Sequence, residues 1–463
     1  MTAAHGNESA QATTDAMQPR VAVVGAGLAG LAAAVTLQRS GARVHLFERS
    51  RLLGGKATSF QIDGVEVDNG QHVVLQCCTD FIDLARSLGM AETLRFQDRF
   101  TAMVLSRTSA PSRLRAAPLP APLHLAMGFA TYRHLRAADK VRVARALLAA
   151  RRPRHTQSDM ATWLERNHQN AATRRAFWDP FLIPALNAPL ERVSANDGLF
   201  VIRTAFLGGR DAARMGYSTV PLARLADRAA ATCDVVSLRT PVVGVAVRDG
   251  VVVGVRTDRD DTVECDACVL AVPPQRAATI LQSSDLPPIT ELNAFDAEPI
   301  IDVHLWYDRN VRGFDFAAIL DSPVQWVFRK GPGYVCCSLS AAGTLVRRPQ
   351  SELVHLCDSE LRAVIPQLRH AKLVRSACTR DPEATFVPSP GLRRPGPRTS
   401  LPNLVLAGAW TDTGWPATME SAVRSGRAAA RALAGGLPAA LGSVAVTGRS
   451  QAGAGAREVT RAV

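Results

Sequence analysis

Hydrophobic and polar positions along the chain predict a mixed α/β protein. Four apolar residues, Val21 to Val24, are typical of a buried parallel strand. An alanine-rich helix is expected from Leu28 to Arg39, and a second strand from Arg43 to Phe47. A third apolar strand, Ala267 to Val272, stops at two prolines. These segments predict a parallel sheet with helices packed against it.

Other segments have different patterns and predict a second domain interleaved with the first. Hairpins are expected over 59–67 and 242–257, and the stretch 158–210 is expected to be helical. Further strands are expected at 300–306, 324–328 and 334–339. The expected order is a disordered lead-in at 1–17, the first domain at 18–95, 216–275 and 381–440, the second domain at 96–215 and 276–380, and a disordered tail at 441–463.

Glycines follow the first strand in a G-x-G-x-x-G pattern. Gly25 permits a tight turn, Gly27 lets the backbone approach a pyrophosphate, and Gly30 lets the helix pack closely on the strand. The start of the helix, with Leu28 and Ala29, offers free N–H groups and a positive dipole end to phosphates. The pattern predicts a Rossmann-like dinucleotide site.

An acid and a second glycine turn refine this prediction. Glu48 ends the second strand and can accept hydrogen bonds from the adenosine ribose. The first turn alone does not separate FAD from NAD. The following Gly54-Gly55-Lys56 favours FAD, because it can bring backbone and positive charge to the same pyrophosphate. At this point the chain resembles the flavin-dependent amine oxidase and phytoene desaturase superfamily.

A second strong pattern lies near the C-terminus, where a strand from Leu404 leads through a glycine turn into a helix. Pro416 is expected near the first turn of that helix. A reduced flavin carries negative charge near N1 and O2, which a helix N-terminus stabilises. We expect the Met419 N–H to be the donor there and Gly408 to permit close approach to the pyrophosphate.

Three further motifs narrow the resemblance. Asn69-Gly70-Gln71-His72, the stretch Trp178 to Asn187, and Gly414 to Gly426 resemble the hydroxysqualene dehydroxylases, a branch near the phytoene desaturases. The resemblance spans residues 20 to 435 and implies FAD as cofactor, with Gly70, Gln71 and Val242 in its site. Relatives commonly carry Gly-Asp where this chain has Gly408-Ala409, and we expect Asp412 or a water to replace that acid.

The resemblance implies reductive removal of an allylic hydroxyl, in which hydroxysqualene and reduced FAD give squalene, water and oxidised FAD. NAD(P)H or a reductase would supply the electrons. The departing hydroxide needs a proton, and His72 and Asp412 are the candidate acids. His72 can equally be a packed histidine that holds the flavin ring. A carotenoid desaturase, an amine oxidase and a non-catalytic lipid-binding protein remain alternatives, although tyrosine is too scarce for an obvious amine cage.

The substrate would be a long hydrocarbon, so its pocket should be apolar. The aromatic stretch at 177–187 is interpreted either as the wall of such a pocket or as ordinary core. The candidate pocket residues are Trp178, Phe181, Leu182, Leu186, Asn187 and Trp415.

Charge adds an expected partner. The net charge is +13, and the basic residues between 113 and 154 are answered by Asp139 alone. This stretch is either a solvated surface or a basic amphipathic face on anionic lipid. No nucleic-acid module is recognised, and no metal site is predicted. Without a signal peptide or a membrane span in the sequence, we expect a cytoplasmic protein, soluble or peripheral on the inner face of the membrane.

Overall fold

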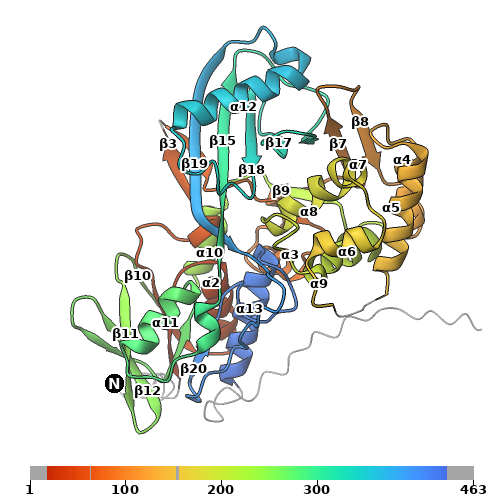
Figure 1. Cartoon of the computed structure of the whole chain (residues 1–463). Coiled ribbons are helices and arrows are strands. Elements are labelled where there is room, and N and C mark those ends of the chain that lie inside the picture. The colour runs from red at the N-terminus through yellow and green to blue at the C-terminus, as the bar shows by residue number, and fades with distance from the viewer. Residues whose placement is uncertain (1–17, 63, 153–155, 435–463) are drawn as a thin grey trace, which may run out of the picture.

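A computed structural model describes residues 18–62, 64–152 and 156–434. The expected lead-in at 1–17 and tail at 441–463 lie outside the described residues. The chain forms two lobes, which Figure 1 shows one above the other. The lower lobe holds the N-terminal strand and the last helix, and the upper lobe holds the long strands of the middle of the chain.

A five-stranded parallel sheet forms the centre of the first lobe, in the order β10-β2-β1-β14-β20. Every neighbouring pair in it is parallel, which confirms the predicted α/β fold. Its strands are largely buried as apolar runs, because helices cover the sheet, except for the edge strand β10, whose residues are exposed or half-buried. The strands are β1 (Arg20–Val24), β2 (Arg43–Phe47), β10 (Val235–Ser237), β14 (Ala267–Leu270) and β20 (Leu404–Leu406).

Helix α2 (Leu28–Arg39) is buried along most of its length, as its alanine-rich sequence requires. It packs against α13 (Met419–Ala434) at Gly426, where an added Cβ would lie 2.1 Å from the Ala29 carbonyl oxygen. The predicted helix start is wrong by one turn, because α13 begins at Met419 and Pro416 precedes it. The other helices of this lobe are α3 (Thr79–Ser87), α10 (Ala223–Ala230) and α11 (Pro274–Gln282), with η1 (Gly55–Ala57), η2 (Ala91–Thr93) and η6 (Thr290–Asn293).

Three small antiparallel sheets extend this core. One is the expected hairpin with its extra edge, at the lower left of Figure 1. The other two small sheets are formed by segments of the chain that run between the two lobes. The strands are β11 (Val242–Arg248), β12 (Val251–Thr257) and β13 (Thr262–Glu264); β3 (Ser59–Ile62) and β4 (Val65–Asp68); and β5 (Val74–Leu75), β6 (Leu94–Phe96) and β9 (Met215–Ser218).

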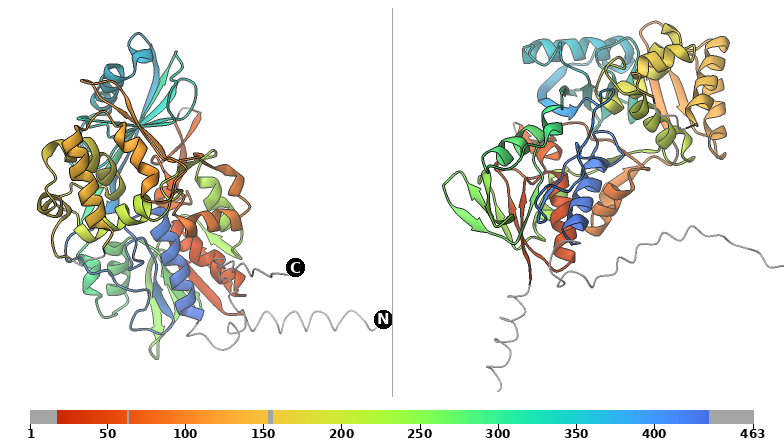
Figure 2. Two further views of the ribbon diagram at one scale, coloured as in Figure 1. Left: turned by 90° about the vertical axis from the view of Figure 1, so that its right-hand side faces the viewer. Right: turned by 60° about the horizontal axis from the view of Figure 1, so that its bottom comes forward.

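A seven-stranded sheet forms the second lobe, in the order β19-β15-β18-β17-β16-β7-β8. Helix α12 (Gln350–Val364) covers one face, followed by η7 (Pro366–Leu368), and Figure 2 shows the remaining helices gathered at the opposite end of the lobe. The strands are β7 (Thr101–Leu105), β8 (Ser112–Arg115), β15 (Ala297–Tyr307), β16 (Phe316–Ile319), β17 (Trp326–Arg329), β18 (Tyr334–Leu339) and β19 (Leu373–Phe386).

The expected helical stretch is confirmed as a run of short helices. They are α6 (Met160–Arg166), α7 (Ala171–Thr173), η4 (Arg174–Trp178), α8 (Asp179–Leu186), α9 (Ala195–Val201) and η5 (Ile202–Leu207). The helices before this stretch are η3 (Leu123–Leu125), α4 (Ala126–Ala130) and α5 (Ala137–Ala150). The chain enters the second lobe at β15 rather than at residue 276, because α11 and η6 pack into the core of the first lobe.

Candidate functional site

The first glycine turn has the geometry of a phosphate cradle. An added Cβ at Gly30 would lie 1.9 Å from the Gly25 carbonyl oxygen, whereas one at Gly27 would meet nothing within 4 Å. The turn is therefore closed on its inner side and open on the side where a ligand would approach. Among the described residues, no acceptor lies within hydrogen-bond distance of the N–H groups of Leu28, Ala29 and Gly30. These donors fit a pyrophosphate.

The acid and the second glycine turn both contact the first turn. The Glu48 carboxylate accepts hydrogen bonds from the N–H groups of Ala26 and Ser50, each at 2.8 Å. Gly54 pairs with Gly27 in a parallel bridge, and an added Cβ at Gly55 would lie 3.0 Å from Gly27 Cα. The two glycine turns thus form one surface, as the sequence predicts.

Lys56 is placed differently from its expected role. Its Nζ lies 3.3 Å from Asp381 Oδ2, on β19 of the second lobe, and it also donates to the Glu383 carbonyl. In this arrangement the ammonium group ties the second glycine turn to the other lobe. Its charge is shared with Asp381 rather than directed only toward a phosphate.

The segment Gly70 to His72 continues the cradle from Lys56. The His72 ring is hydrogen-bonded to the Lys56 backbone, and its Nε2 is buried with no partner among the described residues. Burial lowers the pKa of His72, so the ring is neutral near pH 7. An unpaired buried ring nitrogen beside a dinucleotide cradle fits a flavin-holding role, which sequence reasoning kept as one of two roles for His72.

The C-terminal segment presents a second helix start. The hydroxyl of Thr418 accepts from the Ser421 N–H at 3.1 Å, and the Met419 N–H has no acceptor among the described residues. This free donor fits the expected contact with the flavin. By contrast, the space beside Gly408 is filled by the chain itself, since an added Cβ would lie 2.1 Å from Trp410 Nε1.

Asp412 lies on an exposed turn. Its carboxylate accepts from the Gly414 N–H at 3.3 Å, and its own N–H donates to the Pro395 carbonyl. The loop around it is held by Arg394, a residue that sequence reasoning missed. Arg394 donates to the carbonyl oxygens of Ala409, Trp410, Thr411 and Trp415. Nothing in its Pro- and Gly-rich surroundings signals this role.

The predicted pocket residues occupy the core of the second lobe. Trp178, Leu182 and Leu186 are wholly buried, and Trp178 donates to Gln169 Oε1 at 2.9 Å. Asn187 is also buried and bonds to Glu298, Thr385 and Ala341 across three segments. Phe181 reaches the seven-stranded sheet, where its ring centroid lies 5.9 Å from that of Trp326.

Two predicted residues lie elsewhere. Val242 is buried at the start of β11, where its carbonyl accepts from Arg276 at 3.2 Å. Trp415 packs edge-on against Phe200 at 5.1 Å and lies under the Arg424 guanidinium.

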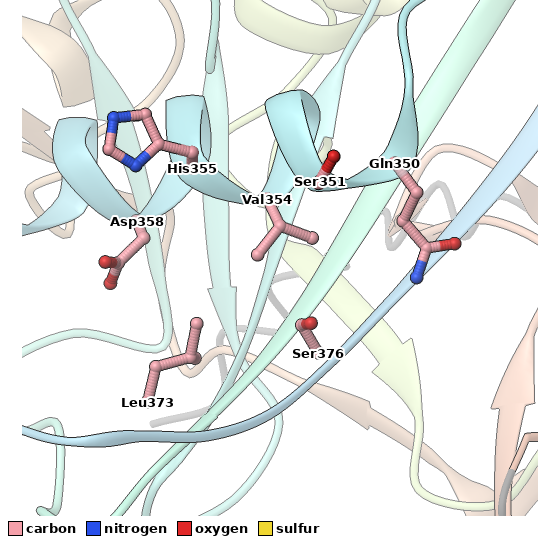
Figure 3. A pocket seen from close by; sticks show the side chains of 7 residues that line it. All are labelled: Gln350, Ser351, Val354, His355, Asp358, Leu373 and Ser376. Carbon is pink, nitrogen blue, oxygen red and sulfur yellow. The ribbon is translucent and has the colours of Figure 1, made fainter.

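A surface cavity of about 460 Å³ lies between α12 and β19 (Figure 3). None of the residues predicted for the site lines it. Its lining side chains are Gln350, Ser351, Val354, His355, Asp358, Leu373 and Ser376.

A polar cluster on β15 was missed by sequence reasoning. Asp302 and His304 are two residues apart, so they share the sheet face that points away from α12. Burial raises the pKa of Asp302 to about 6 and lowers that of His304 to about 4, where nearby Lys330 adds to the effect. His304 Nδ1 lies 2.8 Å from the Tyr334 hydroxyl. An acid and a histidine at alternate positions of an apolar strand were the available signal.

Comparison with known proteins identifies the cofactor. Residues 28–434 match the model of the family described as flavin containing amine oxidoreductase. The chain is 30% identical to a hydroxysqualene dehydroxylase of Sinorhizobium fredii over 89% of its own length and 98% of that protein. It is 24% identical to the 15-cis-phytoene desaturase of Synechococcus elongatus, over 89% and 95% of the two chains.

Solved structures of the same fold include a putative protoporphyrinogen oxidase from Exiguobacterium, at a TM-score of 0.68, with 16% identity and 90% and 98% of the two chains covered. A putrescine oxidase gives 0.69, at 19% identity over 90% and 99%. The two glycine turns, the free helix donors and the unpaired His72 nitrogen fit FAD, which is the cofactor of this protein. The chain belongs to the family of flavin-containing amine oxidoreductases, as an FAD-dependent oxidoreductase similar to the hydroxysqualene dehydroxylases.

Proposed function

We propose that this enzyme reductively removes the allylic hydroxyl of hydroxysqualene to give squalene. The observation that carries the proposal is the similarity to hydroxysqualene dehydroxylases along nearly the whole chain. Reduced FAD supplies the hydride that replaces the hydroxyl group. The protein has to bind a long apolar chain, exclude water and bring the polar end of the substrate to the cofactor.

One face of the seven-stranded sheet supports this proposal. Trp326 and Phe328 on β17 lie in register with the strand that carries Asp302 and His304, on the same face. Asp302 is nearer the cofactor segment around Gly70, and Trp326 and Phe328 are nearer the helices of the second lobe. A substrate with one hydroxyl on a long hydrocarbon matches that division between polar and apolar surface.

The second candidate is a carotenoid desaturase, which would move hydride toward FAD. It is favoured by the similarity to a 15-cis-phytoene desaturase over most of the chain. An amine oxidase is less well supported, because the buried polar positions of the sheet face hold Asp302 and His304, and the lysine near them, Lys330, is exposed.

Anaerobic incubation separates the two candidates. We expect the reduced holoenzyme to convert hydroxysqualene to squalene, with one flavin oxidised for each squalene formed. The measurement is lipid chromatography together with flavin absorbance. Dehydrogenated polyenes from phytoene with the oxidised enzyme, and no squalene from hydroxysqualene, would favour the desaturase.

We also propose that the basic stretch rests on anionic membrane lipid. No helix in the described residues is long and apolar enough to cross a bilayer. Yet half of the exposed large hydrophobic side chains in the described part lie at the outer edge of the second lobe, around α4 and α5 (Figure 1). They are Leu119, Leu123, Met127, Val141 and Leu148. Arg145, also exposed, lies between the last two on α5. Apolar side chains among arginines match an anionic lipid surface.

A charge at Met127 is expected to weaken this binding about tenfold, since burying one such side chain contributes about 1.5–3 kcal/mol. Co-sedimentation of Met127→Glu with phosphatidylglycerol vesicles measures the effect. Val374→Glu is the matched control, because Val374 on β19 is 63% exposed and Met127 65%. Equal binding of both variants and the wild type would contradict the membrane contact.

A further inference from the structure

Asp302 is placed where the cofactor cradle meets the second lobe. The cradle runs from Gly27 to Gly55 and through Lys56 to the His72 ring. A Cβ built on Gly70 would lie 3.3 Å from Asp302 Oδ2 and 3.8 Å from His72 Nε2. The two side chains therefore converge on one point beside the Gly70 backbone. The Gln71 backbone also hydrogen-bonds to the Asp302 carboxyl group.

In the described residues the carboxyl group of Asp302 forms no ion pair, although Lys330 is near enough to lower its pKa. Its side chain is 1% exposed, and its neighbours are the Ser338 hydroxyl and the Cys336 thiol, whose Sγ lies 3.8 Å from Oδ1. A buried carboxyl group without an ion pair favours its protonated form. The departing hydroxide needs a proton from an acid near the flavin. Of the two acids predicted from the sequence, Asp412 is exposed and His72 is neutral, so neither is a buried, protonated acid at this place.

On its other side, Asp302 borders the aromatic part of the same sheet face. Trp326 is opposite Ser338, which is itself opposite Asp302, so the three lie in a row across β17, β18 and β15. Phe181 of α8 packs on Trp326, whose Nε1 donates to the Pro180 carbonyl at 2.9 Å. Asp302 thus separates a polar cofactor segment from an apolar wall.

We propose that Asp302 is the proton donor to the departing hydroxyl group. This inference rests on the proposed reductive function. The Asp302 proton moves to the substrate oxygen as the allylic C–O bond breaks, and water leaves. The carbon gains a hydride and is reduced, and FAD is oxidised. The carboxylate then regains a proton from solvent, so the sum is alcohol, anionic reduced FAD and one proton to hydrocarbon, water and oxidised FAD.

The charge state of Asp302 depends on the groups that face it. The pKa of Asp302 is about 6, so the protonated fraction decreases as pH rises through 6, and the rate should fall with it. His304 is neutral there because burial lowers its pKa to about 4, and burial also lowers the pKa of His72. Burial raises the pKa of the Cys336 thiol and of the Tyr334 phenol. The facing titratable and charged groups are His72, His304, Lys330, Tyr334 and Cys336, together with Asp68, which acts on both histidines and on Tyr334. Cys337 and Cys378 lie on the opposite face of the sheet, beside Val303.

Asp302→Asn tests the proposal because asparagine keeps the shape and cannot supply the proton. We expect squalene formation about 100-fold slower or more, with little change in KM, and loss of the fall in rate above pH 6. The matched control is Thr379→Val. Thr379 is opposite Asp302 on β19, and its hydroxyl has no partner in the described part of the chain. This control should keep wild-type rates.

A spectroscopic readout separates this inference from the proposed function. Ionisation of Asp302 beside the flavin should shift the absorption spectrum of the oxidised wild-type holoenzyme between pH 5 and 7.5, and Asp302→Asn should abolish the shift. If that shift occurs but no substrate is reduced, the proposed function fails while Asp302 stays placed at the cofactor. A wild-type spectrum without any change in this range, or an unchanged rate and pH profile in Asp302→Asn, would overturn the proposal.

Discussion

Gly30→Ala is expected to abolish FAD binding and to destabilise the protein. The new Cβ would lie 1.9 Å from the Gly25 carbonyl oxygen and 3.1 Å from the Cβ of Ala271, which directly follows β14. Overpacking costs about 1–3 kcal/mol where side chains can move. Here the obstruction is backbone, so the turn itself must open, and the free N–H groups at the start of α2 lose their alignment.

Flavin content after purification and thermal unfolding measure both effects. We expect a colourless protein that takes up no added FAD, with a Tm lower than that of the wild type. Gly209→Ala is the control, because a Cβ there meets nothing within 4 Å. A yellow Gly30→Ala protein with wild-type FAD content would show that this turn is not the phosphate cradle.

Arg394→Met is expected to have the second largest effect, at the other end of the cofactor site. Its guanidinium group donates to four backbone carbonyls of the loop between β20 and α13 and lies 3.2 Å from the Thr413 hydroxyl. Hydrogen bonds to charged groups contribute about 1.5–3 kcal/mol each, and several are lost together. The loop should loosen and the Met419 N–H should lose its fixed position.

We expect Arg394→Met to lower the Tm by roughly 5–10 °C, because several of these hydrogen bonds are lost together. The dissociation constant for FAD should rise at least about tenfold, since tenfold corresponds to only 1.4 kcal/mol. The measurements are thermal unfolding and FAD titration of the apoprotein. Arg393→Met is the matched control, since Arg393 is the exposed neighbour. If both variants behave alike, Arg394 does not organise this loop.

The first βαβ unit could be predicted from the sequence because its signals are local. The pattern gave Leu28 to Arg39 and Arg43 to Phe47, and the structure has the same bounds for α2 and β2. The start of α13 was misplaced because a proline suits the first turn of a helix, whereas here Thr418 caps it. The local sequence is therefore compatible with a helix start near Pro416 or at Met419, and only the tertiary structure selects between these two positions.

The polar cluster could not be assembled from the sequence. Asp302 and Gly70 are far apart along the chain, and their approach depends on how the two lobes pack. The same holds for Arg394, whose acceptors are backbone carbonyls that carry no residue-specific signal. The sequence does carry a partial signal for Asp302, since an acid within the apolar strand β15 is unusual without a function.

The aromatic stretch at 177–187 is mostly core, although the sequence also allowed a pocket wall there. Its density of large side chains suggested a pocket wall, yet Trp178 and Leu182 are wholly buried among their neighbours. Sequence cannot separate the inner and outer layers of an apolar region, because both need the same residue types. Phe181 reaches the sheet face and is the member placed to border a substrate.

Titration of the flavin-free wild-type protein with FAD tests the central claim most directly, namely that the two glycine turns and the start of α13 hold one flavin. The absorbance near 450 nm follows the uptake. The account predicts saturation at one FAD per chain, with the spectrum of a protein-bound oxidised flavin. A folded wild-type protein that binds no FAD would contradict it.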